Sequence, residues 1–299
     1  MAEYKNLVIF LSTDKHPSPF DAQVIHDAGA DHVISYGNVT PEEAKSLTLD
    51  AMFPRGPKGV QHTTLFIGGG DIKKAEGITK VAKKSMFPPF EMAIVSDPRG
   101  AYTTSSALVA KTEDALKKNY GMQLKGSNVT ILAGAGLVGS LAATLLAMEE
   151  ANVTIADIAV DYAKQRAKEI NEKVAGNRVK VHIEYPEEGA YSACKDAHII
   201  MSTGPPGFQL LKKDVLTKLS NCKVVADVNA VSPPGIEGLK PTWDCKEVVP
   251  GVIGIGALTT GSLKLRVELS LIKKAIEAPS GYFGYKEAFE IARELLLRP

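Results

Sequence analysis

The chain has 299 residues with a formal net charge of +1, and 44% of its residues are hydrophobic and 23% are charged. This composition predicts an ordinary globular protein with room for two domains, and the near-zero charge argues against a nucleic-acid or anionic-membrane partner. No apolar run reaches the length of a membrane span, and the three cysteines lack the spacing of a metal site or disulfide framework, which fits a reducing cytoplasm.

The first hundred or so residues alternate short apolar, β-branched runs with helical segments. Strands are expected at residues 7–11, 32–36, 63–67 and 92–95. One helix has a clear start, because Thr40, Pro41 and Glu43 match the N-cap, first and third positions of a capping box. The alternation predicts an N-terminal α/β domain with a parallel sheet.

Polar loops follow the carboxyl ends of these four strands, at residues 12–16, 37–40, 68–71 and 96–100. In open parallel sheets, ligands bind outside the carboxyl ends of the strands. Each loop taken alone also fits ordinary turn chemistry. Taken together, the loops favour a substrate-binding face on the N-terminal domain.

The strongest motif lies within residues 129–157. An apolar run at 129–133 is followed by Gly134, Gly136 and Gly139, spaced G-x-G-x-x-G, then by helix formers and a second apolar run at 153–156. This is the strand–turn–helix–strand context of a dinucleotide fingerprint. The glycines permit a tight turn, a close approach of the pyrophosphate, and packing of helix on strand, and the helix N-terminus favours phosphate. The cofactor-binding residues expected here are Gly134, Ala135, Gly136, Leu137, Val138 and Gly139.

Asp157 ends the second strand of this unit and bears on the choice of cofactor. A carboxylate here can accept hydrogen bonds from the adenosine ribose hydroxyls and repels a 2′-phosphate. The nearest cations that follow, Lys164 and Arg166, lie further along the next helix. The sequence therefore favours NAD over NADP, although an early start of that helix would bring these cations within reach of the phosphate.

Further strands are expected at 179–183, 198–202, 223–227 and 252–254, which completes a C-terminal-half Rossmann domain with a parallel sheet. Two of them end in ligand-facing polar segments, and from these we expect further cofactor contacts by Ser202, Thr203, Gly204 and Asn229. A helix at 103–116 is a plausible connector between the domains. The predicted division is an N-terminal substrate domain at 1–118, joined by C-terminal helices at about 262–299, and a dinucleotide domain at 119–261.

A glycine-rich segment at 253–261 precedes a helix expected at about 262–277. Apolar residues on two sides of this helix suit a position between two domains. Lys264 would fall in its first turn, where the helix dipole disfavours a cation. Pairing with an anion or with ligand carbonyls would explain that placement, and a solvated lysine is the alternative.

Several ordered segments match a known family from end to end. They are T-D…P-S…F-D at 13–21, G-A-D-H at 29–32, Y-G-N-V-T-P at 36–41, G-G-G-D at 68–71, D…T-T at 97–104, L-A-G…G…V-G at 132–139 and G-I-G…L-K-L at 254–265. On these residues the chain resembles bacterial NAD(P)-dependent methylene-tetrahydromethanopterin dehydrogenases. The resemblance implies two α/β domains with the pterin in the cleft between them, and a cytoplasmic homo-oligomer, either a trimer or a hexamer.

The resemblance also implies site residues. It implies that Lys264 and Asp97 act in catalysis, with NAD as cofactor and NADP possible, and with no metal. The substrate-binding residues that it implies are Asp14, Phe20, Asn38, Thr103, Thr104 and Lys264. NADP-specific members carry a Gly-Arg pair where this chain has Asp157 and Ile158, a departure that supports NAD or dual use.

The implied reaction moves a hydride from a methylene bridge between two nitrogens to the nicotinamide. That step transfers no proton, so it needs no general acid or base, and no histidine of the chain is placed as one. Two alternatives remain open. The first is a methylene-tetrahydrofolate dehydrogenase, although the N-terminal segment of this chain has no counterpart of the Tyr-x-x-x-Lys pair found in the bifunctional folate enzymes. The second is a non-enzymatic NAD-binding regulator, which would leave the second polar face unexplained.

Overall fold

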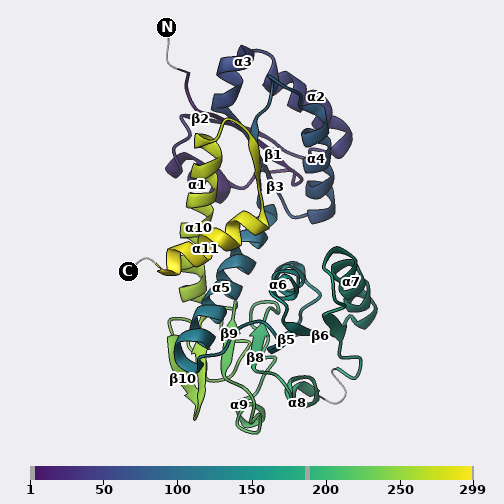
Figure 1. The fold of residues 1–299 in the computed structure, drawn as a ribbon, viewed down its shortest axis with the longest axis vertical. Helices are drawn as coiled ribbons and strands as arrows, with labels where there is room; N and C mark the ends of the chain where they lie inside the picture. The colour runs from purple at the N-terminus through teal and green to yellow at the C-terminus, as the bar shows by residue number, and fades with distance from the viewer. Residues whose placement is uncertain (1–3, 186–188, 298–299) are drawn as a thin grey trace. The chain divides into compact units, whose positions relative to one another are not determined.

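The computed structural model describes residues 4–185 and 189–297. The chain divides into two compact units, Met1–Thr103 with Leu265–Ile291 and Thr104–Lys264 with Ala292–Pro299. Each unit contains one β-sheet, and the divisions fall inside three helices (Figure 1). These helices are α5 (Ala101–Tyr120), α10 (Ala257–Glu277) and α11 (Tyr285–Leu297).

The first unit is built on a parallel sheet with the strand order β12-β4-β3-β1-β2. The central strands are apolar and fully buried because helices cover them, as in other parallel sheets. The four expected strands are present, whereas the fifth, β12, was not predicted because three residues carry little pattern. The strands are β1 (Leu7–Ser12), β2 (His32–Tyr36), β3 (Thr63–Gly68), β4 (Ala93–Ser96) and β12 (Gly281–Phe283).

The helices between these strands begin at side-chain caps. Ser18 caps α1 (Pro19–Asp27), and Asp71 caps α4 (Ile72–Ser85). The predicted capping box at Thr40 is confirmed at the start of α2 (Pro41–Met52), where the Glu43 N–H donates to Thr40 and Glu43 accepts from the Thr40 N–H. A one-turn helix, α3 (Gly56–Gly59), and the 3-10 turn η1 (Val60–His62) lead into β3. A second 3-10 turn, η2 (Pro98–Gly100), follows β4.

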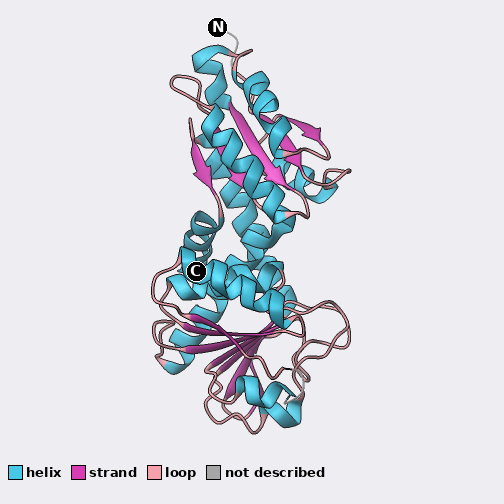
Figure 2. Cartoon of the chain, turned by 90° about the vertical axis from the view of Figure 1, so that its right-hand side faces the viewer, coloured by secondary structure: helices cyan, strands magenta, loops and turns pink. Residues whose placement is uncertain are grey.

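The second unit contains a seven-stranded sheet in the order β10-β11-β9-β8-β5-β6-β7, in which only the β10–β11 pair is antiparallel. Helices lie on both faces of this sheet (Figure 2). The strands are β5 (Asn128–Leu132), β6 (Asn152–Ala156), β7 (Val179–Val181), β8 (Ile199–Ser202), β9 (Val224–Asp227), β10 (Asp244–Val249) and β11 (Val252–Ile255). The predicted fold class, α/β with a Rossmann domain, is confirmed.

The other helices of this unit are α6 (Leu137–Met148), α7 (Val160–Lys173), α8 (Gly189–Cys194) and α9 (Lys213–Leu216). Two expectations were wrong here. The antiparallel strand β10 was missed because its first half is polar, and α10 begins at Ala257 rather than near residue 262. None of the described helices combines the length and apolar character needed to cross a membrane.

Both sheets have a topological switch point, at which successive connections run to opposite edges. In the second unit the chain passes from β5 to β6 on one side and places β8 on the other, so the switch point lies between β5 and β8. In the first unit β1 has β2 on one side and β3 on the other. Ligands of open parallel sheets bind at such points, beyond the strand carboxyl ends.

Candidate functional site

The glycine turn of the second unit connects β5 to α6 at the switch point. Ala133 leaves the strand with a positive φ of 54°, a left-handed conformation that is uncommon for a residue with a side chain. Its backbone N–H donates to the Ala156 carbonyl at 2.8 Å, and its carbonyl accepts from Thr203 Oγ1 at 3.1 Å. The neighbouring strands therefore hold this turn in a fixed shape.

The three glycines occupy sites of different kinds. A Cβ added to Gly139 would lie 2.6 Å from Gly134 Cα and 2.7 Å from Thr203 Oγ1, and one added to Gly134 would lie 2.8 Å from the Ile131 carbonyl oxygen. A Cβ on Gly136 would meet only one protein atom, at 3.8 Å. Gly134 and Gly139 are therefore needed for packing, whereas the space beside Gly136 is open and suits the pyrophosphate of a dinucleotide.

Gly136 is also the N-cap of α6, and it provides no capping side chain. The first N–H groups of a helix have no partner within the helix, and together with the helix dipole they favour a phosphate. Leu137 and Val138 form the first turn of α6, and both are half-buried. These residues fit the negatively charged centre of NAD or NADP.

Asp157 is buried, with 8% of its surface exposed. Its Oδ2 accepts a hydrogen bond from the Ala135 N–H and its Oδ1 one from the Ala159 N–H, both at 3.0 Å. The carboxylate thus connects the end of β6 to the glycine turn. Each carboxylate oxygen can accept a further hydrogen bond, so this support of the turn is compatible with the predicted ribose contact.

Loops after β8 and β9 supply the other predicted cofactor residues. Thr203 is half-buried, and its hydroxyl lies against the glycine turn. Gly204 is also half-buried, and a Cβ there would lie 2.7 Å from Leu210 Cδ1. Ser202 is 1% exposed, and Asn229 is 4% exposed. Asn229 accepts from the Val231 N–H at 2.8 Å and donates to the Pro233 carbonyl at 3.1 Å, which shapes its loop.

Asp227 was absent from the predicted site residues, although it ends β9 at the same edge. Its carboxylate accepts from the backbone N–H groups of Asn229 at 3.0 Å and Ile236 at 3.3 Å. Burial raises the pKa of this carboxyl, against the effect of these hydrogen bonds. A Cβ on Gly235 would lie 2.0 Å from Ser202 Oγ and 2.9 Å from Asp227 Oδ1, so Gly235 is required for this packing.

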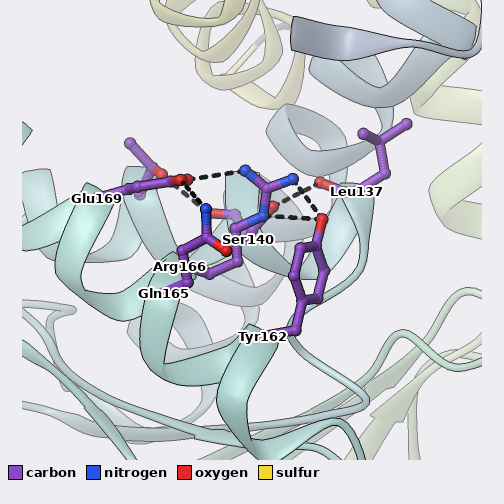
Figure 3. A network of polar contacts seen from close by, with 7 residues as sticks. Leu137, Ser140, Tyr162, Gln165, Arg166 and Glu169 are labelled. Atoms are coloured by element: carbon purple, nitrogen blue, oxygen red, sulfur yellow. Dashed lines mark hydrogen bonds and ion pairs between the residues drawn. The ribbon is translucent and has the colours of Figure 1, made fainter.

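The two cations that bear on NADP use lie on α7. Figure 3 shows the Arg166 side chain between Tyr162 and Glu169, beside the first turn of α6. Its Nη1 donates to Glu169 Oε2 at 2.8 Å, its Nε donates to the Tyr162 hydroxyl at 3.1 Å, and its Cζ lies 4.8 Å from the centre of the tyrosine ring. Lys164 is mostly exposed and lies 3.5 Å from Asp161. Arg166 is thus already held by two partners, whereas Lys164 is exposed and paired only with Asp161 on the same helix.

The polar loops of the first unit converge at its own switch point. The Gly70 N–H donates to Asp14 Oδ1 at 2.9 Å, and the Asn38 N–H donates to the Asp14 carbonyl at 2.8 Å. Asp14 and Asn38 are exposed, and Asn38 has a positive φ of 56°. Three loops that are distant in sequence therefore form one polar surface beyond β1, β2 and β3.

Asp97 and Thr103 lie beneath this surface rather than on it, since they are 1% and 0% exposed. Asp97 Oδ1 accepts from the Tyr102 N–H at 2.8 Å, and Oδ2 accepts from Thr103 Oγ1 at 2.6 Å. These bonds satisfy N–H groups at the start of α5, which otherwise would have no partner. The observed role of Asp97 is to fix the turn between β4 and α5, and its predicted catalytic role stays a prediction.

Three further predicted residues lie on helices. Phe20, in the first turn of α1, exposes 51% of its surface. Thr104 is half-buried on α5, and Lys264 is half-buried on α10. Because α10 begins at Ala257, Lys264 lies about two turns into the helix, and the argument from an unfavourable helix dipole was wrong.

The fold and the glycine turn together define a dinucleotide-binding α/β protein with a Rossmann unit and a second unit built on a parallel sheet. The chain is 36% identical to a bifunctional protein named MdtA from Methylorubrum extorquens, with 97% of this chain and 99% of that protein covered. It is 32% identical, over 97% and 99%, to the NAD(P)-dependent methylenetetrahydromethanopterin dehydrogenase of the same organism. The chain therefore belongs to the family of NAD(P)-dependent methylenetetrahydromethanopterin dehydrogenases.

Two domain families match separate parts of the chain. Residues 19–99 match the N-terminal domain of methylene-tetrahydromethanopterin dehydrogenase, and residues 115–261 match the C-terminal domain of alanine dehydrogenase and PNT. Quinate dehydrogenase from Corynebacterium glutamicum, solved in complex with NAD, is similar in fold, with a TM-score of 0.50, 13% identity and coverage of 99% and 100%. That likeness concerns the fold alone.

The open space at Gly136 generates a sharp prediction. Gly136→Val should weaken NAD binding at least about 100-fold, because the branched side chain occupies space that only the pyrophosphate needs. Titration calorimetry would measure the affinity, and the thermal unfolding temperature should stay within a few degrees of the wild type. Gly139→Ala is the matched comparison, since its Cβ meets backbone and should lower the free energy of unfolding by about 1–3 kcal/mol. Normal NAD affinity in the Gly136 variant would refute the assignment of the turn.

Proposed function

We propose that this protein oxidises methylene-tetrahydromethanopterin to methenyl-tetrahydromethanopterin, with NAD(P)+ as hydride acceptor. The observation that carries the proposal is the near-complete coverage by the relatives, one of which is named for this reaction. The open glycine turn at Gly136 supports it, because it provides the space that the dinucleotide requires. The likeness extends over both units, so both the cofactor side and the substrate side contribute to the proposal.

The proposed hydride transfer needs no general acid or base. The C–H bond of the methylene bridge breaks, its electron pair leaves with the hydrogen as hydride, and the lone pairs of two flanking nitrogens stabilise the remaining cation. Bound NAD(P)+ supplies the carbon that accepts the hydride. The residues of this chain then have one main task, which is to hold the two rings in a reactive arrangement at about 3–3.5 Å.

The proposed substrate residues differ in the roles that their burial allows. Asp14, Asn38 and Phe20 are exposed at the carboxyl edge of the first sheet and are available for direct contact. Asp97 and Thr103 are buried, which supports an indirect role in positioning the loop that follows β4. The proposal also includes Thr104 and Lys264 as substrate contacts, and a cytoplasmic homo-oligomer, a trimer or hexamer, as the family resemblance implies.

We further propose that NAD is preferred over NADP. The Asp157 carboxylate stands at the end of β6, Ile158 beside it is 76% exposed without charge, and Arg166 is already bound to Tyr162 and Glu169. A phosphate on the ribose would approach a fixed negative charge without a free arginine to receive it. These features favour an unphosphorylated ribose.

Steady-state kinetics with both nucleotides and both pterins tests the proposal. Methylene-tetrahydromethanopterin should be oxidised, with kcat/KM for NAD about 10- to 100-fold above that for NADP, a difference of about 1.4–2.8 kcal/mol in transition-state stabilisation. A higher kcat/KM with methylene-tetrahydrofolate would show that the protein is a methylene-tetrahydrofolate dehydrogenase instead. Absence of turnover with either pterin, in protein that binds NAD, would favour the non-enzymatic alternative, and a clear preference for NADP would contradict the role given to Asp157.

Lys264 is the charged residue on α10 that the family resemblance assigns to catalysis. Lys264→Ala should lower kcat with the pterin about 10- to 100-fold, because loss of a substrate contact misplaces the pterin ring relative to the nicotinamide, while the NAD dissociation constant stays within about twofold. Lys273→Ala on the same helix is the control, because that lysine is exposed and forms only a weak ion pair with Glu277. Equal kinetics in the two variants would mean that Lys264 has no part in catalysis and is a structural or solvated lysine.

A further inference from the structure

Arg99 lies at the ligand-binding edge of the first sheet but is not among the residues assigned to the proposed function. It lies in η2, directly after β4, and is exposed at the carboxyl edge of the first sheet. Within the described residues, 4–185 and 189–297, no hydrogen bond or ion pair joins its side chain to the protein. An arginine with five N–H donors and no protein partner, at a ligand-binding edge, is available to a ligand.

The backbone holds Arg99 in an unusual conformation, with φ 53° and ψ 29°. Non-glycine residues in this left-handed region are uncommon and cluster at functional sites. Asp97 fixes the chain on both sides of it. The Asp97 N–H donates to the Ile67 carbonyl at 3.1 Å, and the Asp97 carboxylate binds the N–H groups of Tyr102 and Thr103. The buried Asp97 network therefore sets where the Arg99 side chain begins.

The partner group at this edge is Asp14. Arg99 Nη1 and Asp14 Oδ1 both lie 3.2 Å from the position that a Cβ on Gly70 would occupy. Asp14 Oδ1 accepts from the Gly70 N–H, while no described residue donates to its Oδ2. Gly70 thus separates a carboxylate with a free oxygen from a guanidinium with free donors, at the switch point between β1 and β3.

Two aromatic side chains accompany this pair in the same part of the unit. Phe20 follows the β1 loop and is 51% exposed, and Tyr36 ends β2 and is 41% exposed. Exposed aromatic rings suit stacking against a flat heterocycle. The edge therefore offers apolar ring surface, one hydrogen-bond acceptor and one set of donors.

We propose that Arg99 and Asp14 recognise the 2-amino-4-oxo edge of the pterin ring. The Asp14 carboxylate would accept from the 2-amino and N3–H groups, and the Arg99 guanidinium would donate to the 4-oxo oxygen, which are charge-assisted bonds of suitable polarity. Arg99 is thus a specificity-determining residue, and Asp97 and Thr103 are positioning residues for it. This inference rests on the proposed function for the identity of its ligand.

The test compares two probes that differ at position 4 of the ring and, as a consequence, in the proton at N3. 6-Methylpterin has a 4-oxo acceptor and an N3–H donor, whereas 2,4-diamino-6-methylpteridine has a 4-amino donor and an unprotonated N3. The intact wild-type protein should bind the oxo probe about 10- to 100-fold more tightly in an equilibrium titration. Arg99→Met should lose the part of that discrimination that comes from the 4-oxo contact, so that it binds the oxo probe about 10-fold more weakly and the diamino probe and NAD unchanged. The part that comes from the N3–H bond to Asp14 should remain.

Lys84→Met is the matched control, because it removes one exposed cation from the same unit. Lys84 lies about 18 Å along α4 from Ile72, the first residue of that helix, and therefore far from Gly70. It should keep full discrimination between the probes. Equal binding of both probes by the wild type, or unchanged discrimination in Arg99→Met, would overturn the inference. The proposed function fails separately: discrimination through Arg99 with no oxidation of methylene-tetrahydromethanopterin would uphold pterin recognition and reject the reaction.

Discussion

The contact on which the cofactor side depends is the approach of Gly139 in α6 to Gly134 at the end of β5. A Cβ at Gly139 would lie only 2.6 Å from Gly134 Cα, so the helix can start this close to the strand only because both residues lack side chains. The closeness brings the N–H groups of the first helical turn to the switch point. Asp157 and Thr203 then hold the turn from two neighbouring strands. The anion-binding property of the helix terminus follows from this packing.

The first unit holds the loops at its switch point in place with different residues. Its switch point has no glycine fingerprint, and its polar loops are held by backbone and carboxylate hydrogen bonds among Asp14, Asn38 and Gly70. The Asp97 carboxylate has a corresponding role after β4, where it caps α5 and fixes the chain around Arg99. In both units, a buried carboxylate holds the backbone of a loop, Asp157 in the second unit and Asp97 in the first.

The proposed reaction explains why such rigid loops would be favoured. Hydride transfer needs two rings held within a few tenths of an ångström of a reactive distance, and it needs no proton donor. Buried carboxylates that bind several N–H groups reduce the freedom of a loop without exposing charge to the reacting carbon.

The sequence by itself determined the features that are local in the chain. The glycine spacing, the capping box at Thr40 and the alternation of strands and helices all follow from residues within a few positions of one another, and they predicted both sheets and the fold class. Arg99 and Asp227 were visible only as members of polar loops, because a single sequence does not distinguish a turn residue from a ligand-facing one.

The tertiary structure alone decided what depends on distant partners. Strand β12 forms because β4 offers it an open edge, and α10 extends back to Ala257 through Gly261 because packing overrides the low helix propensity of glycine. Asp97 was predicted in a polar loop and is 1% exposed, since the first turn of α5 covers the carboxylate. Burial and hydrogen bonding between segments far apart in sequence leave no local pattern, and for that physical reason only the folded chain revealed them.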